Sequence, residues 1–229
     1  MALPHDLVVP FEAASGGYLV EGYGLSECSP VLMANPVAGN RVPGSVGLPL
    51  PGTECRVVDP EDPSADVEPG ARGELVVRGP QVFQGYYGKP EETDAVFADG
   101  WFRTGDIVTI DEAGFVRIVD RIKELIITGG FNVAPTEVEN ALRQHPDVDD
   151  AAVVGLPSDR SGEEVVAAVV CAPGREIDVD ELREFARGIL TPYKVPRRIF
   201  LVDELPKSLI GKVLRRQVRE SLVTLTTGS

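Results

Sequence analysis

Hydrophobic positions follow two different patterns along the 229-residue chain. Up to about residue 122, short runs rich in valine and isoleucine are separated by turn signals such as Pro51-Gly52 and Asp99-Gly100. Short apolar runs bounded by Gly and Pro are typical of strands. The elements expected on this basis are strands at residues 56–58, 74–78 and 106–110, with an acidic, Pro-rich, solvated loop over residues 59–69.

After residue 122, strand-like runs alternate with segments of helical spacing. One segment opens with Pro135, which suits the first position of a helix, and Asp178 is placed to cap another. Two predicted strands, 115–120 and 125–128, lie on either side of residue 122. The predicted order after them is helix 135–144, strands 151–155 and 165–171, helix 179–190, strand 199–202 and helix 212–222. The fold class is therefore α+β, and the charged joint Asp120–Glu124 marks a boundary between domains 1–122 and 123–229.

Charge and composition narrow the classes of protein. The chain has 22 basic and 36 acidic residues, a formal net charge of −14, which argues against non-specific nucleic-acid binding. Residues 1–122 hold 8 of the basic and 19 of the acidic residues. No apolar run approaches the ~20 residues of a membrane span, and the first residues lack a signal-peptide pattern. We therefore expect a cytoplasmic protein with no transmembrane segment, and peripheral contact with a membrane stays open.

Cysteine and histidine are scarce. Cys28, Cys55 and Cys171 are too far apart for a visible disulfide framework or zinc spacing, and they are expected to be reduced, partly buried thiols. With only His5 and His145 in the chain, a His-centred triad or a multi-His metal site is improbable. Catalysis would have to use carboxylates, lysine, arginine and backbone amides.

Two glycine-rich segments in the first part carry candidate chemistry. In Gly22-Tyr23-Gly24-Leu25-Ser26-Glu27 the glycines let the backbone approach a flat ligand, while the hydroxyl and the carboxylate suit a phosphate oxygen and Mg²⁺. The alternative is a Gly-rich turn after a strand. In residues 100–106, Asp106 can accept hydrogen bonds from vicinal ribose hydroxyls, or it is simply a turn-capping aspartate beside a packed tryptophan.

Two further segments lie around and after the boundary. In residues 120–139, Arg121 offers a fork of donors for ribose or phosphate oxygens, and Gly129-Gly130 leaves room for an extended ligand. The alternative is a β-hairpin with a salt-bridged turn that runs into a helix. Residues 194–216 hold seven basic residues against two acidic ones, which indicates an anionic ligand or, alternatively, a basic solvated helix.

Together, in this order and spacing, the four segments resemble the adenylate-forming enzymes, which include acyl-CoA synthetases, luciferases and peptide-synthetase adenylation domains. Residues 44–49, 79–87 and 205–216 resemble the branch of bacterial long-chain-fatty-acid–CoA ligases. The resemblance extends from about residue 1 to about residue 220. It implies a β-rich, barrel-like end of a large AMP-binding domain, followed by a small mobile α+β C-terminal domain.

The resemblance also implies a role for each matching residue and implies fatty acid, ATP and CoA as substrates. Tyr23 and Gly24 would line the adenine, Ser26 would contact phosphate, Asp106 would bind the ribose hydroxyls, and Arg121 would bind ribose or phosphate. Glu27 would help hold Mg²⁺, Lys123 would lie at the hinge between the domains, Gly129 and Gly130 would border the pantetheine tunnel, and Lys212 would bridge carboxylate and phosphate oxygens during adenylation.

The sequence departs from the family pattern in two places. Ser26 stands where the family more often has threonine, and the Gly/Ser/Thr-rich phosphate loop that ends in Pro-Lys is absent. We therefore expect the C-terminal portion of a longer ligase, inactive alone. The alternatives are a portion of another adenylating enzyme, such as an aryl- or short-chain-acid ligase or a peptide-synthetase domain, and a non-catalytic nucleotide-binding or interaction domain. Acyl chain length and oligomeric state stay open.

Overall fold

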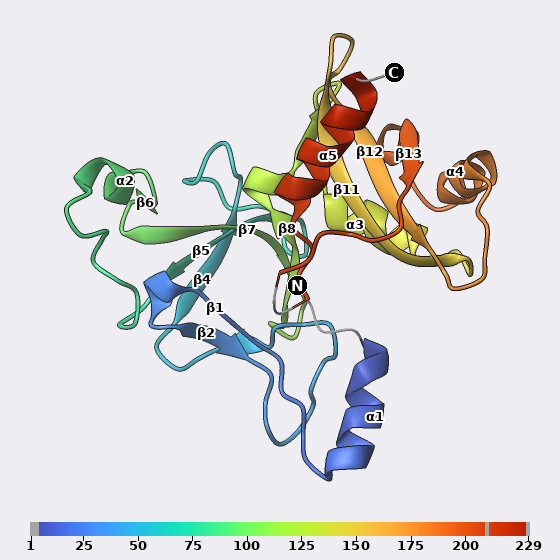
Figure 1. Ribbon diagram of the computed structural model, residues 1–229. Helices are drawn as coiled ribbons and strands as arrows, with labels where there is room; N and C mark the ends of the chain where they lie inside the picture. The colour runs from blue at the N-terminus through green and yellow to red at the C-terminus, as the bar shows by residue number, and fades with distance from the viewer. Residues whose placement is uncertain (1–4, 209–210, 228–229) are drawn as a thin grey trace. The chain divides into compact units, whose positions relative to one another are not determined.

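The computed structural model describes residues 5–208 and 211–227, and the chain divides into two compact units, Met1–Ile122 and Lys123–Ser229 (Figure 1). They are called unit 1 and unit 2 below. Both units combine helices with strands, so the predicted α+β class is confirmed. Within the described ranges no helix is both long and apolar enough to span a membrane.

Unit 1 is dominated by short strands. Its elements are α1 (His5–Ser15), β1 (Gly22–Gly24), the 3-10 turn η1 (Ser26–Cys28), β2 (Val31–Ala34), β3 (Leu48–Pro49), β4 (Glu54–Val58), β5 (Gly73–Arg78), α2 (Pro90–Asp94), β6 (Phe97–Ala98), β7 (Trp101–Ile110) and β8 (Val116–Arg121). The strands predicted in this part lie within β4, β5 and β7, which confirms them. The helices α1 and α2 were not expected, because α1 has Pro10 in its interior and α2 is only 5 residues long.

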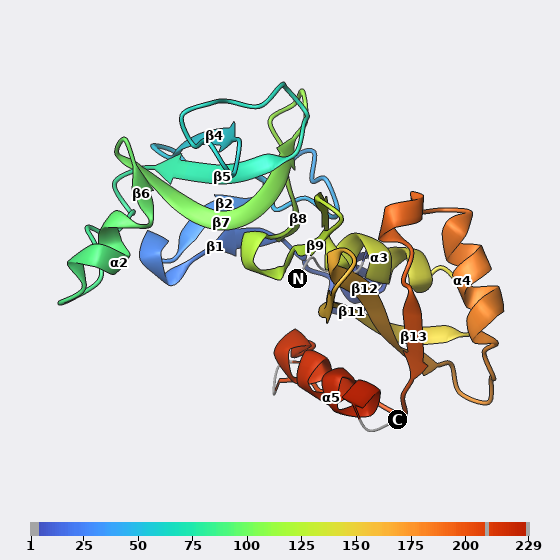
Figure 2. The same ribbon diagram turned by 90° about the horizontal axis from the view of Figure 1, so that it is seen from above.

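The strands of unit 1 form two antiparallel sheets, β1-β2-β3 and β4-β5-β7-β6, with β8 added to β7. Strand β7 is strongly curved (Figure 2). The pairing register of β7 shifts once against β5, between Glu74 and Val76, and once against β8, at Ile107/Val108. Such bulges bend a strand and increase its twist. The sheets therefore curl around a buried cluster that includes Leu32, Leu75 and Val116.

Unit 2 alternates strands and helices as the sequence predicted. Its elements are η2 (Ile122–Glu124), which begins at the last residue of unit 1, then β9 (Ile126–Thr128), β10 (Phe131–Val133), α3 (Pro135–Leu142), β11 (Val148–Ser158), β12 (Gly162–Cys171), α4 (Val179–Arg187), η3 (Pro192–Lys194), β13 (Arg198–Leu201) and α5 (Arg215–Thr227). Asp178 caps α4, as expected, by accepting from the backbone N–H groups of Asp180 and Glu181 at 2.8 and 3.1 Å.

The prediction for the last helix was wrong at its start. α5 begins at Arg215, three residues after Lys212, and continues to Thr227. The reason is a local hairpin: Lys207 and Val213 form an antiparallel bridge, and Leu214 N–H donates to Pro206 O at 2.8 Å. Backbone groups already paired across this hairpin cannot take part in a helix. Lys212 therefore lies on the hairpin and not on the helix.

Unit 2 has three layers, with α3 and α4 on one face of the sheet and α5 on the other (Figure 2). Successive side chains of a strand point to opposite faces. Accordingly Ala151 and Val153 pack with Leu142 and Leu182 in one buried cluster. The intervening residues of the same strand pack with the α5 residues Val218 and Leu222 in a second cluster; they are Ala152, Val154 and Leu156. A continuous apolar run in β11 and β12 is what a sheet covered on both faces requires.

Candidate functional site

A buried carboxylate on β7 joins three of the residues that the sequence singles out in unit 1. Asp106 is 1% exposed. Its Oδ2 accepts from Tyr23 Oη at 2.5 Å, and its Oδ1 accepts from Arg121 Nε at 2.9 Å. The pairing of β7 with β8 sets Asp106 directly opposite Arg121, and β1 brings Tyr23 to the same place. Each carboxylate oxygen therefore accepts from one donor among the described residues, and an ionised carboxylate oxygen can accept more than one hydrogen bond.

The hydroxyl of Tyr23 stays protonated at any ordinary pH. Burial of the side chain, followed by the neighbouring charge of Asp106, raises the pKa of Tyr23 far above its usual value of 10.0. Tyr23 is thus a fixed donor to Asp106. Arg121 leaves about half of its side chain in solvent, at 51% exposure, and its remaining guanidinium N–H groups can reach an anionic or hydroxyl-bearing ligand.

A second buried carboxylate, which the sequence reasoning did not select, supports this arrangement. Glu74 on β5 is 2% exposed; its Oε2 accepts from Arg103 Nη2 at 2.6 Å, and its Oε1 accepts from Gly105 N–H at 3.1 Å. Gly105 directly precedes Asp106, so Glu74 fixes the backbone that carries the site carboxylate. The signal in the sequence is a glutamate followed at once by the apolar run Leu75-Val76-Val77.

The Gly22–Glu27 segment has a structural explanation for one of its glycines. A Cβ at Gly24 would lie 1.7 Å from Pro30 O, so no other residue fits there without movement of the backbone. The close approach is to the chain itself, as in the alternative of a Gly-rich turn. Ser26 is exposed at the start of η1, and Glu27 Oε1 accepts from Tyr86 Oη at 3.0 Å. Burial, and then this hydrogen bond, raise the pKa of Tyr86.

Glu27 is the residue that the resemblance assigns to Mg²⁺. Among the described residues no group of three or more His, Cys, Asp or Glu side chains could hold a metal ion by itself. Mg²⁺ commonly takes one or two carboxylates and completes its shell with water and substrate phosphates. The half-buried Glu27 carboxylate, with one donor from Tyr86, fits such a partial role.

In unit 2, Gly129 and Gly130 form the turn of the β9–β10 hairpin, with φ values of +57° and +82°. A β-hairpin that runs into α3 is thus present, as in the alternative that the sequence left open for residues 120–139. Gly129 also lines a pocket of about 480 Å³. Phe131 and Tyr193 stack with ring centroids 4.4 Å apart in the wall of this pocket, and the wall also contains three arginines, Arg183, Arg187 and Arg197.

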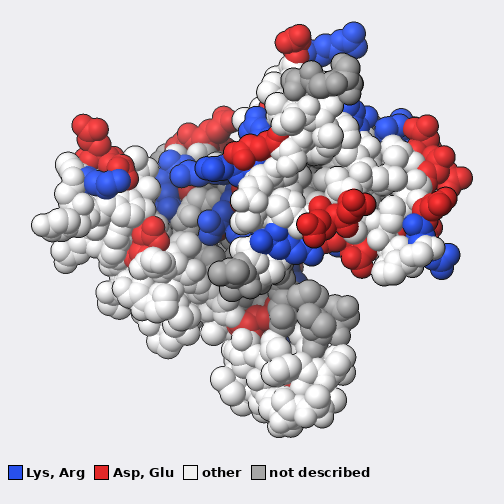
Figure 3. Space-filling view, in the orientation of Figure 1, with Lys and Arg blue, Asp and Glu red and all other residues white. Residues whose placement is uncertain are grey.

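The basic segment 194–216 is mostly neutralised by acidic residues from elsewhere in unit 2. Ion pairs join Lys194 to Glu137, Arg198 to Glu164, Lys207 to Asp150, Arg215 to Glu139 and Arg216 to Glu220. A count limited to residues 194–216 missed these partners because all of them lie outside that stretch, and four of the five are distant in the chain. Acidic side chains also gather over α4 (Figure 3). The excess of positive charge along this segment is therefore far smaller in the fold than in the sequence.

Lys212 differs from most of its basic neighbours. Its side chain is exposed, and none of the acidic residues that the structure describes forms an ion pair with its ammonium group. The backbone is held by Ser208, whose N–H donates to Lys212 O at 2.8 Å and whose Oγ accepts from Lys212 N–H at 3.2 Å. Leu209 and Ile210 of the same motif lie outside the described residues. Lys123, the expected hinge residue, is exposed in η2.

Comparisons with known proteins identify the family. The family described as "AMP-binding enzyme" matches residues 1–87, and "AMP-binding enzyme C-terminal domain" matches residues 137–212. A long-chain-fatty-acid–CoA ligase of Bacillus subtilis (strain 168) is 48% identical over 219 residues, 96% of this chain and 39% of that protein. The chain belongs to the AMP-binding, adenylate-forming enzymes. A ligase of the same name from Escherichia coli O157:H7 is 49% identical over 90% of this chain and 36% of its own length.

A solved structure of this family agrees in fold. ATP-bound MatB from Rhodopseudomonas palustris matches with a TM-score of 0.87 and 41% identity, over 94% of this chain and 43% of that protein. The resemblance inferred from the four motifs is therefore confirmed. The chain spans less than half the length of the curated relatives that it matches.

Proposed function

We propose that this chain is part of an AMP-forming fatty-acid–CoA ligase, with residues 1–122 as the end of the AMP-binding domain and residues 123–229 as its mobile C-terminal domain. The observation that carries the proposal is the cluster of Tyr23, Asp106 and Arg121. A buried carboxylate with one donor on each oxygen suits a pair of vicinal hydroxyls, as on the ribose of ATP. Gly24, with Tyr23, would line the adenine, and Ser26 would contact phosphate.

In the first half-reaction a carboxylate oxygen of the acid attacks the α-phosphorus of ATP. The bond from that phosphorus to the pyrophosphate oxygen breaks, and acyl-AMP and pyrophosphate are formed. Negative charge gathers on the phosphoryl oxygens, so the chemistry calls for a cation that is not already paired. Lys212 suits this role because its ammonium group has no ion-pair partner among the described acidic residues. Mg²⁺, with Glu27 as one ligand, would neutralise phosphate charge.

In the second half-reaction the thiolate of CoA attacks the acyl carbonyl carbon and AMP leaves. Gly129 and Gly130 would border the path of the pantetheine arm, since neither carries a side chain. The pocket beside Gly129 supports CoA as the thiol, because its stacked aromatic pair suits a flat base and its arginines suit phosphates. Use of two different sites of the C-terminal domain requires a conformational step, for which Lys123 is the proposed hinge.

The test of this function uses the full-length protein that contains the chain. Pyrophosphate release is measured against a panel of long-chain, short-chain and aromatic acids, and acyl-CoA is measured after addition of CoA. Release with long-chain acids supports the proposal. Release only with aromatic or short-chain acids would assign the chain to another branch of the family. Absence of release with every acid would favour a non-catalytic nucleotide-binding domain.

Two variants and one truncated protein test the assigned residues. Lys212→Ala is expected to cripple pyrophosphate release and to leave acyl-CoA formation from supplied acyl-AMP largely intact; equal loss of both steps would contradict the role of Lys212. Lys123→Pro is expected to impair the passage between the two steps. The 229-residue chain alone is expected to form no acyl-AMP, because it carries no Gly-rich phosphate loop.

A further inference from the structure

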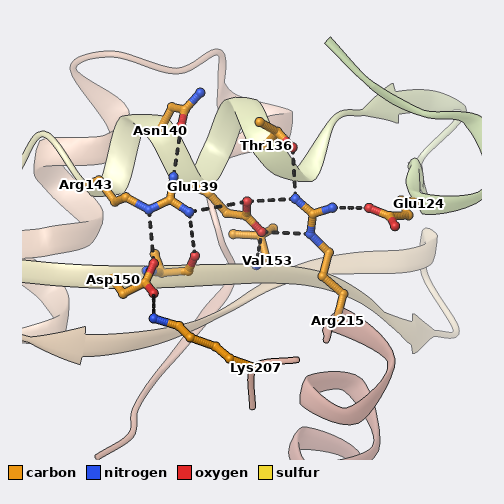
Figure 4. Close-up of polar contacts among 10 residues, drawn as sticks. Glu124, Thr136, Glu139, Asn140, Arg143, Asp150, Val153, Lys207 and Arg215 are labelled. Atoms are coloured by element: carbon orange, nitrogen blue, oxygen red, sulfur yellow. Dashed lines mark hydrogen bonds and ion pairs between the residues drawn. The ribbon is translucent and has the colours of Figure 1, made fainter. Parts of the chain in front are cut away.

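One buried glutamate of unit 2 lies between two arginine side chains, Arg143 and Arg215 (Figure 4). Glu139 on α3 is 4% exposed. Its Oε1 accepts from Arg215 Nε at 2.9 Å and from Val153 N–H at 2.9 Å, and its Oε2 accepts from Arg215 Nη2 at 2.8 Å. Arg143 Nη2 lies 3.6 Å from the same Oε2. Two parallel bonds from one guanidinium fix both the distance and the plane of the Arg215 side chain.

Arg215 is held by more than this one partner. Its Nη2 also donates to Thr136 Oγ1 at 2.9 Å, and its Nη1 pairs with Glu124. Arg215 is the first residue of α5, so these contacts attach the start of that helix to α3 and to the turn η2. The guanidinium cannot shift without loss of several bonds at once.

A second ion pair attaches the other end of the segment. Asp150 on β11 accepts from Lys207 Nζ at 2.7 Å and from Arg143 Nε at 3.2 Å (Figure 4). Partial burial of Asp150 would raise its pKa, but the hydrogen bonds from Lys207 and Ala151 N–H outweigh it, and the pKa is lowered. Asp150 therefore remains an anion, and the pair persists, at any pH near neutrality.

Lys207 and Arg215 flank the hairpin that carries Lys212. The flanks are thus attached by charge to two neighbouring elements, Arg215 to α3 and Lys207 to β11. Between them the Lys207–Val213 bridge and the Ser208 bonds close the hairpin. Gly211 has a φ of +79°, a conformation that favours glycine. The backbone of Lys212 is hydrogen-bonded to Ser208 within this hairpin, between the two ion pairs.

We propose that the ion pairs Glu139–Arg215 and Asp150–Lys207 are positioning devices that hold Lys212 for the adenylation step. This inference rests on the proposed function of Lys212. A buried ion pair commonly adds little stability over a well-packed apolar substitute, because desolvation offsets the attraction. The ion pairs can nevertheless affect the rate through the position of Lys212, because a shift of about 1 Å in a reacting group can cost ~10²-fold in rate. Arg215 and Lys207 themselves need not touch substrate.

The experiment compares Arg215→Met and Lys207→Met with Arg216→Met in the full-length ligase. Methionine keeps an unbranched stem and removes the charge. Arg216 is the matched control: it follows Arg215 directly, its side chain is 90% exposed, and its one ion pair with a described residue lies within α5, with Glu220. The two half-reactions are measured separately, as pyrophosphate release and as acyl-CoA formation from supplied acyl-AMP. Hydrogen exchange of residues 207–214 gives an independent readout of the hairpin.

We expect Arg215→Met and Lys207→Met to lower kcat of adenylation by about 10- to 100-fold. KM for ATP and the thioester-forming step are expected to change by less than about threefold, and exchange of the hairpin amides to accelerate. Arg216→Met is expected to behave as wild type. Equal loss of both half-reactions, or no loss in adenylation, would overturn the proposal.

Two further comparisons distinguish a failure of the inference from a folding defect and from a failure of the proposed function. Lys207 is 46% exposed, so Lys207→Met tests the positioning role even if Arg215→Met fails to fold. If Lys207→Met also fails to fold, the pairs serve stability and the proposal is wrong. Lys212→Ala tests the proposed function itself: adenylation unaffected by Lys212→Ala would refute that function, whereas loss with Lys212→Ala but not with the positioning variants would refute only the inference.

Discussion

Replacing Glu74 with glutamine should destabilise unit 1 more than any exposed charge change in that unit. The glutamine keeps an oxygen for Gly105 N–H, but it takes away the anion that faces two donors of Arg103, Nε at 2.9 Å and Nη2 at 2.6 Å. Loss of one partner from a buried ion pair typically costs ~3–5 kcal/mol. Arg103 keeps 28% of its side chain exposed and can regain some hydration. We therefore expect about 3 kcal/mol, the lower end of that range.

The assay is urea denaturation of the 229-residue chain, followed by tryptophan fluorescence. Trp101 is the one tryptophan in the sequence and lies on β7 in unit 1, so its emission reports that unit alone. With an m-value of ~2 kcal/mol/M, a loss of ~3 kcal/mol lowers the urea midpoint by ~1.5 M. An unchanged m-value would show that the variant still unfolds from a comparably compact state.

The matched control is Glu92→Gln, which breaks an exposed pair with Lys89 in the same unit. Both side chains of that pair are more than half exposed, so a loss of at most ~0.5 kcal/mol is expected. If Glu74→Gln and Glu92→Gln lower the midpoint equally, the buried carboxylate is not the support of β7 that the geometry indicates. The proposed function adds a second expectation: in the full-length protein, Glu74→Gln should weaken ATP binding, because Glu74 holds Gly105, which directly precedes Asp106.

Three other predictions concern single groups. Asp178→Ala should destabilise α4 by ~1 kcal/mol, because it removes the acceptor of two backbone N–H groups, while Asp180→Ala in the same turn should cost much less; circular dichroism during thermal unfolding measures both. Burial, and then the charge of Glu27, raise the pKa of Cys28 to about 11, and burial raises the pKa of Cys55 to about 12. At pH 8 both thiols should therefore react with iodoacetamide at least ~100-fold more slowly than in the denatured chain. Mass spectrometry of the alkylated protein measures these rates. Because the pKa of Asp150 is lowered on folding, its carboxylate stabilises the chain above the unfolded pKa of about 4, and this contribution is lost as the pH falls through the folded pKa; Asp150→Asn should therefore cost stability at pH 7 and progressively less below about pH 4. A difference that persists undiminished at pH 2 would contradict that assignment.

Local chemistry explains what could be predicted. The runs at 56–58, 74–78 and 106–110 became strands, because valine and isoleucine between Gly and Pro turns suit an extended, half-buried backbone. Asp178 caps α4 for an equally local reason. The family could be inferred because glycine, hydroxyl, carboxylate and lysine positions recur at fixed spacing in the four motifs.

The charged groups of unit 2 show why the rest could not be predicted. A count of charges from residue 194 to residue 216 indicates a basic surface, yet Lys207 and Arg215 are neutralised by Asp150 and Glu139. Arg215 and Glu139 are 76 residues apart in the chain. Similarly, the predicted helix began at Lys212, but the backbone groups of Lys212 and Leu214 are paired with Ser208 and Pro206, so the helix starts only at Arg215.

The sequence by itself therefore determined the order of the main strands and helices of unit 2, three strands of unit 1, the family and the residue types available for chemistry. Those properties depend on interactions between neighbours in the chain. Only the tertiary structure decided which of the charged residues are paired and which, such as Lys212 and Arg197, have no ion-pair partner among the described acidic residues. It also decided that Tyr23, 83 residues from Asp106, holds that carboxylate. Ion pairing and burial depend on distances in space, and those distances are set by how the sheets curl and pack.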